Sequence, residues 1–130
     1  MELKEKHCWA EIDVDAIRSN YELIKYTLEK PFYTVVKADA YGHGAKYIAK
    51  IYSEMDTFGF CVSNFSEAME LRNSGITKPI LILGYTEPNK AYELFKNNLT
   101  QTVFSLEYAK SLNDQALYPI ECHIKLDTGM

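Results

Sequence analysis

Short runs of β-branched and aromatic residues alternate with helical patterns along the whole chain, and this alternation limits the folds open to it. The apolar runs centre near positions 34, 59, 82, 102 and 123, so a strand and a helix recur roughly every 20 to 25 residues. This pitch predicts an α/β fold with a parallel sheet and right-handed helical crossovers. A doubly wound sheet and a (β/α)8 barrel both fit, but the GxGxxG fingerprint of a dinucleotide fold is missing. Since a complete barrel takes about 250 residues, we expect a partial (β/α)8 (TIM) barrel, about its first half.

Local patterns give the expected elements. Strands are expected at 9–14, 32–36, 58–62, 80–83, 100–104 and 120–126. The first helix is expected to be capped by Asp15 and to reach Leu28, and the second to cover 46–53. The third is expected from Ser63 or Asn64 to Gly75. Pro88 is expected to open a fourth helix that carries Phe95, and the last helix is expected from 105 to about 113.

Charge, termini and cysteines exclude several classes of protein. The formal net charge is −4 and no face collects Lys and Arg, so no nucleic-acid partner is expected. Positions 1–7 are polar and lack an apolar stretch long enough for a signal peptide or membrane span, so no membrane partner is expected. Cys8, Cys61 and Cys122 form neither a disulfide framework nor a CxxC metal pattern. We therefore expect reduced thiols, a cytoplasmic location and no metal.

The most informative stretch reads Val-Val-Lys-Ala-Asp-Ala-Tyr-Gly-His-Gly, over positions 35–44. A strand ends at Lys37, and small residues with two glycines follow before the next helix. In a barrel, the carboxyl ends of the strands build the active site. Apolar neighbours such as Val35 and Val36 lower the cost of a neutral amine, which is a nucleophile toward an aldehyde. A lysine that merely extends to water is the alternative interpretation.

This stretch closely resembles the signature around the pyridoxal-phosphate (PLP) lysine of the alanine racemase family. Three further segments look like landmarks of that family in the family's order: Trp-Ala-Glu-Ile-Asp-Val at 9–14, Ile-Leu-Ile-Leu-Gly-Tyr-Thr at 80–86, and His-Ile-Lys-Leu-Asp-Thr-Gly-Met at 123–130. The resemblance covers essentially the whole chain. It implies that residues 1–130 are the N-terminal part of a PLP-binding barrel domain, with the C-terminal β domain absent. Met1 looks like a natural start, so we expect the missing part on the C-terminal side and little activity from the chain alone.

The resemblance also implies residue roles. Lys37 would form the aldimine with PLP and act as one of two acid–base groups at the substrate Cα, while a tyrosine of the partner subunit in a homodimer would serve as the second. Tyr41 would bond the PLP phosphate, although packing on the barrel rim is the alternative. Val35 lies on the same side of its strand as Lys37 and would contact the cofactor. Leu83 would pack near the ring. For Val35 and Leu83, plain core packing is an equally good interpretation.

Lys125 matches a family lysine that is often carbamylated and braces a downstream arginine. A carbamate turns a cation into an anion, which can form a charge-assisted bond to the arginine fork. That arginine would lie beyond Met130, so an ordinary exposed amine is the alternative for Lys125.

The implied activity is PLP-dependent racemisation of alanine, which supplies D-alanine for peptidoglycan. A serine racemase of the same family is the nearest alternative. A non-catalytic, PLP-binding homeostasis barrel also holds PLP through a strand-end lysine, but such proteins lack the Ala-Asp-Ala-Tyr-Gly-His-Gly continuation and the terminal Asp-Thr-Gly-Met. An inert folding module is the third alternative for the chain as it stands.

Overall fold

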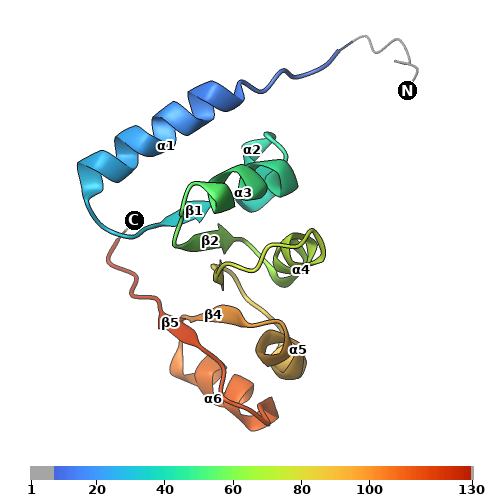
Figure 1. Cartoon of the computed structure of the whole chain (residues 1–130). Helices are drawn as coiled ribbons and strands as arrows, with labels where there is room; N and C mark the ends of the chain where they lie inside the picture. Colours follow the sequence, from blue (N-terminus) through green and yellow to red (C-terminus); the bar gives the residue numbers. More distant parts are fainter. Residues whose placement is uncertain (1–7, 130) are drawn as a thin grey trace.

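The computed structural model describes residues 8–129, in which strands and helices alternate around one parallel sheet (Figure 1). The strands are β1 (Tyr33–Val35), β2 (Gly59–Val62), β3 (Ile80–Ile82), β4 (Leu99–Val103) and β5 (Cys122–Ile124). The helices are α1 (Val14–Leu28), α2 (Lys37–Tyr41), α3 (Ala45–Glu54), α4 (Phe65–Asn73), the 3-10 turn η1 (Pro88–Lys90), α5 (Ala91–Lys96) and α6 (Leu106–Gln115). The predicted parallel α/β fold is confirmed.

The strand order distinguishes the two folds that the sequence allows. The order is β1-β2-β3-β4-β5, and every neighbouring pair is parallel. Each crossover therefore moves one strand further in the same direction. A doubly wound sheet reverses its order at a switch point, and this sheet has no reversal across the described strands. Continuous winding is the arrangement of a (β/α)8 barrel.

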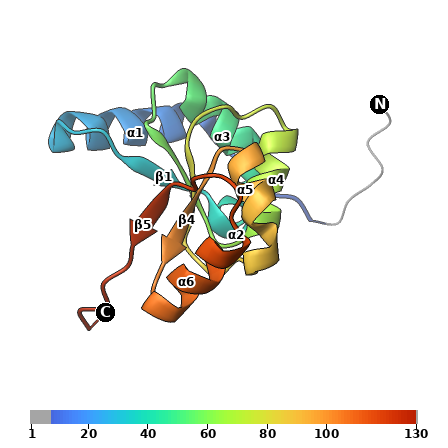
Figure 2. The same cartoon turned by 90° about the horizontal axis from the view of Figure 1, so that it is seen from below.

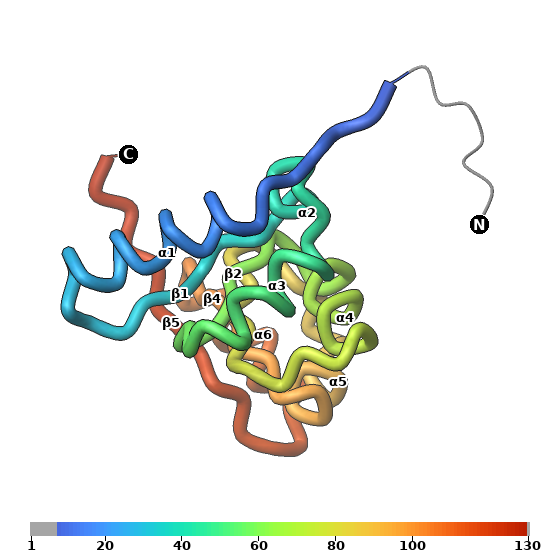
Figure 3. Tube along the Cα trace, turned by 45° about the horizontal axis from the view of Figure 1, so that its top comes forward, coloured from blue at the N-terminus to red at the C-terminus, as the bar shows by residue number. Residues whose placement is uncertain are grey.

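The sheet is curled, so that its two outer strands face each other (Figures 2 and 3). The rings of Tyr33 on β1 and His123 on β5 meet edge to face, with centroids 5.9 Å apart. In a flat sheet, four spacings of about 4.8 Å would separate these strands by about 19 Å. The rings meet because the sheet bends into part of a cylinder. We call its inner side the concave face; its strand residues are Tyr33, Val35, Gly59, Cys61, Leu81, Thr100, Thr102 and His123.

The hydrophobic core lies between the other face of the sheet and the helices α3 to α6, which run along that side (Figure 3). The strands contribute Phe60, Val62, Ile80, Ile82 and Leu99, the residue after β1 contributes Val36, and the helices contribute Ile48, Ala49, Ala68, Leu71, Leu94 and Leu112. Phe60, Ile80, Ile82 and Leu94 are fully buried. Burying each such side chain stabilises the fold by about 1.5–3 kcal/mol. This core packs against the helix side of β2, β3 and β4, and the residues of the concave face lie outside it.

The strand expected at 9–14 does not form. Helix α1 begins at Val14, and residues 9–13 pair with no strand of the described sheet. Trp9 is 69% exposed, and its indole N–H donates to Glu11 at 3.0 Å. Alternating apolar residues mark a segment that can be a strand, but a strand also needs a neighbour to bond. The prediction is therefore wrong for this chain, because no partner strand lies beside the segment.

The side chains that cap the helices agree with those expected from the sequence, except at the start of α1. Asp13, not Asp15, caps α1: its carboxylate accepts the Ala16 N–H at 2.9 Å, because the helix begins at Val14 and places Asp15 inside the first turn. Asn64 caps α4 and Ser105 caps α6, each through its side chain.

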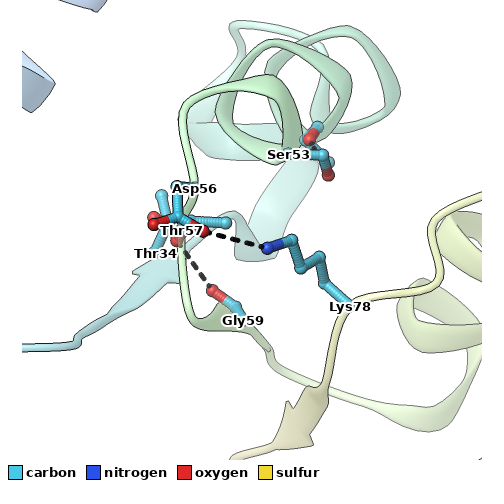
Figure 4. Close-up of polar contacts among 7 residues, drawn as sticks. Thr34, Ser53, Asp56, Thr57, Gly59 and Lys78 are labelled. Carbon is cyan, nitrogen blue, oxygen red and sulfur yellow. Dashed lines mark hydrogen bonds and ion pairs between the residues drawn. The ribbon is translucent and has the colours of Figure 1, made fainter.

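Polar contacts hold the amino ends of β1 and β2 (Figure 4). The Thr57 hydroxyl donates to the Gly59 carbonyl at 3.3 Å and lies 2.9 Å from the Thr34 hydroxyl, which is then the donor of that pair. Lys78 lies 3.7 Å from the Asp56 carboxylate (Figure 4). These contacts tie the loop before β2 to β1 and to the turn before β3.

Arg72 makes a second set of ties at the same end of the sheet. Its guanidinium donates to the carbonyls of Ile76, Lys78, Asn97 and Asn98 at 2.8–2.9 Å. Burial lowers the pKa of Arg72, but these four acceptors compensate for the lost hydration. One side chain on α4 thus fixes the segments that lead into β3 and β4.

Two further expectations concern the membrane and the cysteines. None of the helices within residues 8–129 combines the length and the apolar character needed to cross a bilayer. Residues 1–7, where a leader was not expected, and Met130 of the closing motif lie outside the described residues. Cys8, Cys61 and Cys122 are free thiols.

Candidate active site

Lys37 stands at the carboxyl end of β1, on the concave face. The ladder continues past the strand through a bond from the Val36 N–H to the Cys61 carbonyl at 2.9 Å. Val36 is 1% exposed and lies in the core, so Val35, the preceding residue in β1, faces the other way, on the concave face, and is 42% exposed. Lys37 follows where the backbone leaves the extended conformation, with ψ of 17° at Val36. Three apolar neighbours are expected beside the amine: Val35, Val36 and Ala38. Val36 lies in the core, on the face opposite to Val35, and Ala38 is exposed.

A left-handed turn follows Lys37 at once. Ala38, Asp39, Ala40 and Tyr41 have φ angles between +51° and +54°. Left-handed backbone costs an L-residue roughly 1–2 kcal/mol, so the surrounding structure must impose it four times in succession. Strain of this kind gathers at functional sites.

Local hydrogen bonds hold the turn. The Ala40 N–H donates to the Val36 carbonyl at 2.9 Å. The Asp39 carboxylate accepts the Ala45 N–H at 2.7 Å and so ties the turn to the first residue of α3. Gly42, with φ of +89°, ends the turn in a conformation that only glycine adopts without strain.

The turn brings Tyr41 back to Lys37. The Lys37 ammonium nitrogen lies 6.0 Å from the centroid of the Tyr41 ring, within cation–π range. Tyr41 is 63% exposed, and no described residue bonds its hydroxyl. The structure thus places Lys37 and Tyr41, the two residues of the motif expected to hold the cofactor, side by side, with the phenol open to a ligand.

Glu67, a residue that the sequence reading missed, holds the turn from the next βα unit. Its carboxylate accepts the Ala38 N–H at 3.0 Å and the Ser63 N–H at 2.8 Å. Burial alone would raise the pKa of Glu67, but the bonds from Ser63 and Ala38 and the charge of Lys37 outweigh it and lower that pKa. The residue had one signal in the sequence: Asn64 three positions earlier, the spacing of a capping box.

Two further residues of the concave face could contact a ligand: the apolar Leu83 and Thr102, whose hydroxyl has no hydrogen-bond partner among the described residues. Leu83 extends β3 by donating its N–H to the Val62 carbonyl at 2.8 Å, and it lies on the concave side because Ile82 is in the core. Thr102 is 5% exposed, and its hydroxyl has no partner among residues 8–129. Buried hydroxyls are normally bonded, so this one is available to a ligand or to chain not described.

Lys125 follows β5, the outer strand at the other edge of the sheet. Its N–H donates to the Val103 carbonyl at 2.8 Å, and its side chain is exposed on the same face as His123. Both candidate lysines therefore stand at carboxyl ends of strands, where a barrel keeps its chemistry. Across residues 8–129, no three His, Cys, Asp or Glu side chains gather to hold a metal ion.

Comparison with known proteins gives a consistent result. Residues 12–130 match the family model described as alanine racemase, N-terminal domain. An alanine racemase of Clostridium perfringens is 46% identical over 100% of this chain, which corresponds to 35% of that relative. The crystal structure of the Bacillus anthracis alanine racemase with bound L-Ala-P superposes with a TM-score of 0.90 at 33% identity, over 99% of this chain and 34% of that one. A histidine racemase of Leuconostoc mesenteroides superposes with a TM-score of 0.74 at 29% identity, over 78% of this chain and 28% of that one.

Proposed function

Because the chain belongs to the alanine racemase family, we propose that it supplies the cofactor-binding part of a PLP-dependent enzyme that interconverts L- and D-alanine. The chain spans about a third of the length of the relatives that it matches. The proposed activity therefore belongs to the whole enzyme, and residues 1–130 form the first part of its barrel domain. D-alanine for peptidoglycan is the proposed use of the product.

The observation that carries the proposal is the placement of Lys37 at a strand's carboxyl end, on the concave face beside Tyr41. The same face fits PLP: it offers a primary amine, the exposed apolar side chain of Val35, the half-buried Leu83 and the orphaned hydroxyl of Thr102. Lys37 would hold the cofactor covalently, and the Tyr41 hydroxyl would donate to its phosphate. Val35 and Leu83 would pack against its ring.

When bound, PLP would delocalise the negative charge that develops as the substrate Cα–H bond breaks. Lys37 would take or return the Cα proton on one face of the substrate. Its position at the carboxyl end of β1 would place the amine where the substrate binds. Inversion also needs a group on the opposite face. We assign that role to a tyrosine of the partner subunit in a homodimer, outside this chain, so the chain alone is expected not to racemise alanine.

Lys125 has a supporting role in this proposal. Its carbamylated side chain would brace an arginine from the remainder of the enzyme through a charge-assisted bond. Its exposed position at the end of β5 leaves room for both the modification and the partner. Intact-mass measurement of the full enzyme, with Lys125→Ala as the control, tests this: the carbamate adds a mass that the variant lacks.

The substrate and the compartment are assigned less directly. The L-Ala-P bound by the Bacillus anthracis enzyme supports alanine, and the histidine racemase shows that the fold also serves another amino acid. Racemisation rates with alanine, serine and histidine separate these substrates. The three free thiols fit the reducing cytoplasm that we propose for the enzyme.

The first test is covalent capture of PLP by the chain. We expect an absorbance shift on mixing, and after borohydride reduction one dominant adduct, on the peptide that contains Lys37. Lys37→Ala should abolish this adduct. Lys46→Ala is the matched control, since Lys46 is paired with Glu70 at 2.9 Å on the surface and should not affect capture. Adducts scattered over surface lysines, or unchanged by Lys37→Ala, would contradict the cofactor role.

A further inference from the structure

We propose that Glu67 is a positioning residue for Lys37. Its carboxylate clamps the first peptide of the left-handed turn to the end of β2 and thereby sets the direction in which the Lys37 side chain leaves β1. The inference rests on the proposed function of Lys37 and adds a residue 30 positions away in the chain to the same site.

The two carboxylate oxygens bond different strand ends. Oε1 accepts the N–H of Ala38, which belongs to the peptide that leaves Lys37, and Oε2 accepts the N–H of Ser63, which directly follows β2. Ser63 stands beside Lys37 in register, since Val35 pairs with Cys61. Glu67 therefore links the carboxyl ends of two adjacent strands at the level of the lysine.

Glu67 is well suited to stay charged while it does this. It lies in the first turn of α4, where the helix dipole favours an anion. Its own N–H is bonded by the Asn64 side chain at 3.0 Å, so the start of the helix is fixed independently of the carboxylate. The Asn64 side chain therefore caps α4, and the Glu67 carboxylate holds the turn.

Glu67 adds a tie from the next βα unit to the first peptide of the turn. The other hydrogen bonds that the structure describes for residues 38–41, such as Ala40 to Val36 and Ala45 to Asp39, join residues within positions 36–45. The Val36 bond to Cys61 anchors the start of the turn to the sheet, and the burial of Ala40 anchors its middle to the core. The peptide between these two anchors, which directly follows Lys37, is held by Glu67, so losing the carboxylate should loosen that peptide and let the Lys37 side chain change direction.

The test compares three variants of the chain. Glu67→Gln removes the charge and leaves a single acceptor oxygen. Glu70→Gln is the matched control, because Glu70 lies on the same helix and, among the described residues, its carboxylate pairs with the surface residue Lys46. Gly75→Ala is a stability control: Gly75 ends α4 with φ of +91°, so alanine strains the far end of the helix.

Three measurements report on the clamp. Amide hydrogen exchange of Ala38 reports the bond itself, and we expect it to be at least about tenfold faster in Glu67→Gln, the effect of losing a charge-assisted bond. Acetylation by acetic anhydride reports the accessibility of Lys37, relative to exposed Lys110, and should rise. Capture of PLP by Lys37 should fall by about fivefold or more, since capture needs the amine held in place. Faster acetylation together with weaker capture of PLP would show that the Lys37 amine has become accessible but is no longer held in its position.

The controls make each outcome decisive. Glu70→Gln and Gly75→Ala should leave the ratio of the two reagents unchanged, even though Gly75→Ala unfolds more easily. Unchanged Ala38 exchange in Glu67→Gln, or the same change of ratio in Gly75→Ala, would overturn the inference. If the unsubstituted chain captures no PLP at Lys37, the cofactor role fails, and Ala38 exchange together with acetylation still decides whether Glu67 holds the turn.

Discussion

The two ends of the sheet are built on opposite principles. At the amino end, Arg72 donates to four carbonyls, Thr57 is buried, and a Cβ on Gly59 would lie 2.6 Å from the Pro79 carbonyl oxygen. At the carboxyl end, four successive residues are left-handed, and Tyr41 is 63% exposed. Left-handed residues at the amino end occur singly, as at Asp56 and Asn98, whereas four stand in succession at the carboxyl end beside an exposed side chain.

The difference shows how a parallel barrel divides its work. Residues at the amino end of the strands serve stability, and those at the carboxyl end serve binding and chemistry. In this chain one helix contributes to both ends of the sheet: on α4, Glu67 contacts the carboxyl end and Arg72 contacts the amino end. Substitutions at the two ends should therefore separate loss of folding from loss of site geometry.

The largest effect is expected at the amino end, from Arg72→Ala. The variant loses four bonds from a charged donor and leaves carbonyls before β3 and β4 unpaired, which should lower the free energy of unfolding by about 3 kcal/mol. Arg18→Ala is the matched control: Arg18 pairs with Glu54 on the surface at 2.9 Å, and such pairs contribute about 0–1 kcal/mol. Urea denaturation of both variants measures the difference, and equal losses would contradict the assignment of Arg72.

A pair of glycine substitutions compares the two ends directly. A Cβ on Gly59 would meet the Pro79 carbonyl oxygen at 2.6 Å, and one on Gly84 would meet the Ser63 carbonyl oxygen at 2.4 Å. Each alanine variant should lose about 2 kcal/mol of stability through backbone shifts. Only Gly84→Ala displaces Ser63, so it alone should also reduce capture of PLP by Lys37 at matched folded fraction. Equal capture of PLP by the two variants would contradict the expectation that a change at the amino end of the sheet leaves the site at the carboxyl end intact.

Much of the fold could be predicted because the pattern is local. Strand and helix periods placed every described strand, and a period of two placed Val35 on the face opposite to Val36. The segment 9–14 failed for a non-local reason: it alternates like a strand, but pairing depends on a neighbour that the pattern does not contain. The cap is ambiguous in the sequence, because two aspartates, Asp13 and Asp15, flank the helix start.

The site was harder to predict than the fold. The motif predicts roles for Lys37 and Tyr41, but nothing in Ala-Asp-Ala-Tyr indicates left-handed backbone, since a chain of non-glycine residues adopts it only when its surroundings require it. Glu67 escaped notice because its partner Ala38 is 29 residues away, and side chain to backbone bonds over such distances leave no periodic signal. The capping-box spacing from Asn64 marked Glu67 as a helix residue and not as part of a site.

Tyr41→Phe tests the carboxyl end without disturbing the fold. The hydroxyl is the only group removed, and no described residue bonds it, so stability should change by less than about 0.5 kcal/mol. Loss of a bond to a phosphate should weaken PLP binding about tenfold. Tyr47→Phe is the matched control, because Tyr47 is 75% exposed on the neighbouring α3. Titration of PLP absorbance measures both, and equal affinities in the two variants would remove Tyr41 from the phosphate site.

The smallest effect is a dependence on pH that arises at Glu67. Its pKa is lower in the folded chain than the ordinary value of about 4.3. A carboxylate with a lowered folded pKa contributes stability above its unfolded pKa and loses it as the pH falls through the folded pKa. The stability difference between the unsubstituted chain and Glu67→Gln should therefore be complete near neutral pH and shrink below about pH 4.

Protection of the Ala38 amide, corrected for the intrinsic pH dependence of exchange, should decline over the same acidic range in the unsubstituted chain. In Glu67→Gln it should already be low and should not change there, since the variant has no carboxylate to protonate. In Glu70→Gln the decline should persist, because the bond from Ala38 to Glu67 is intact. A decline that is identical in all three proteins would assign the acid sensitivity to the fold as a whole, and the carboxyl end would then carry no titrating clamp of its own.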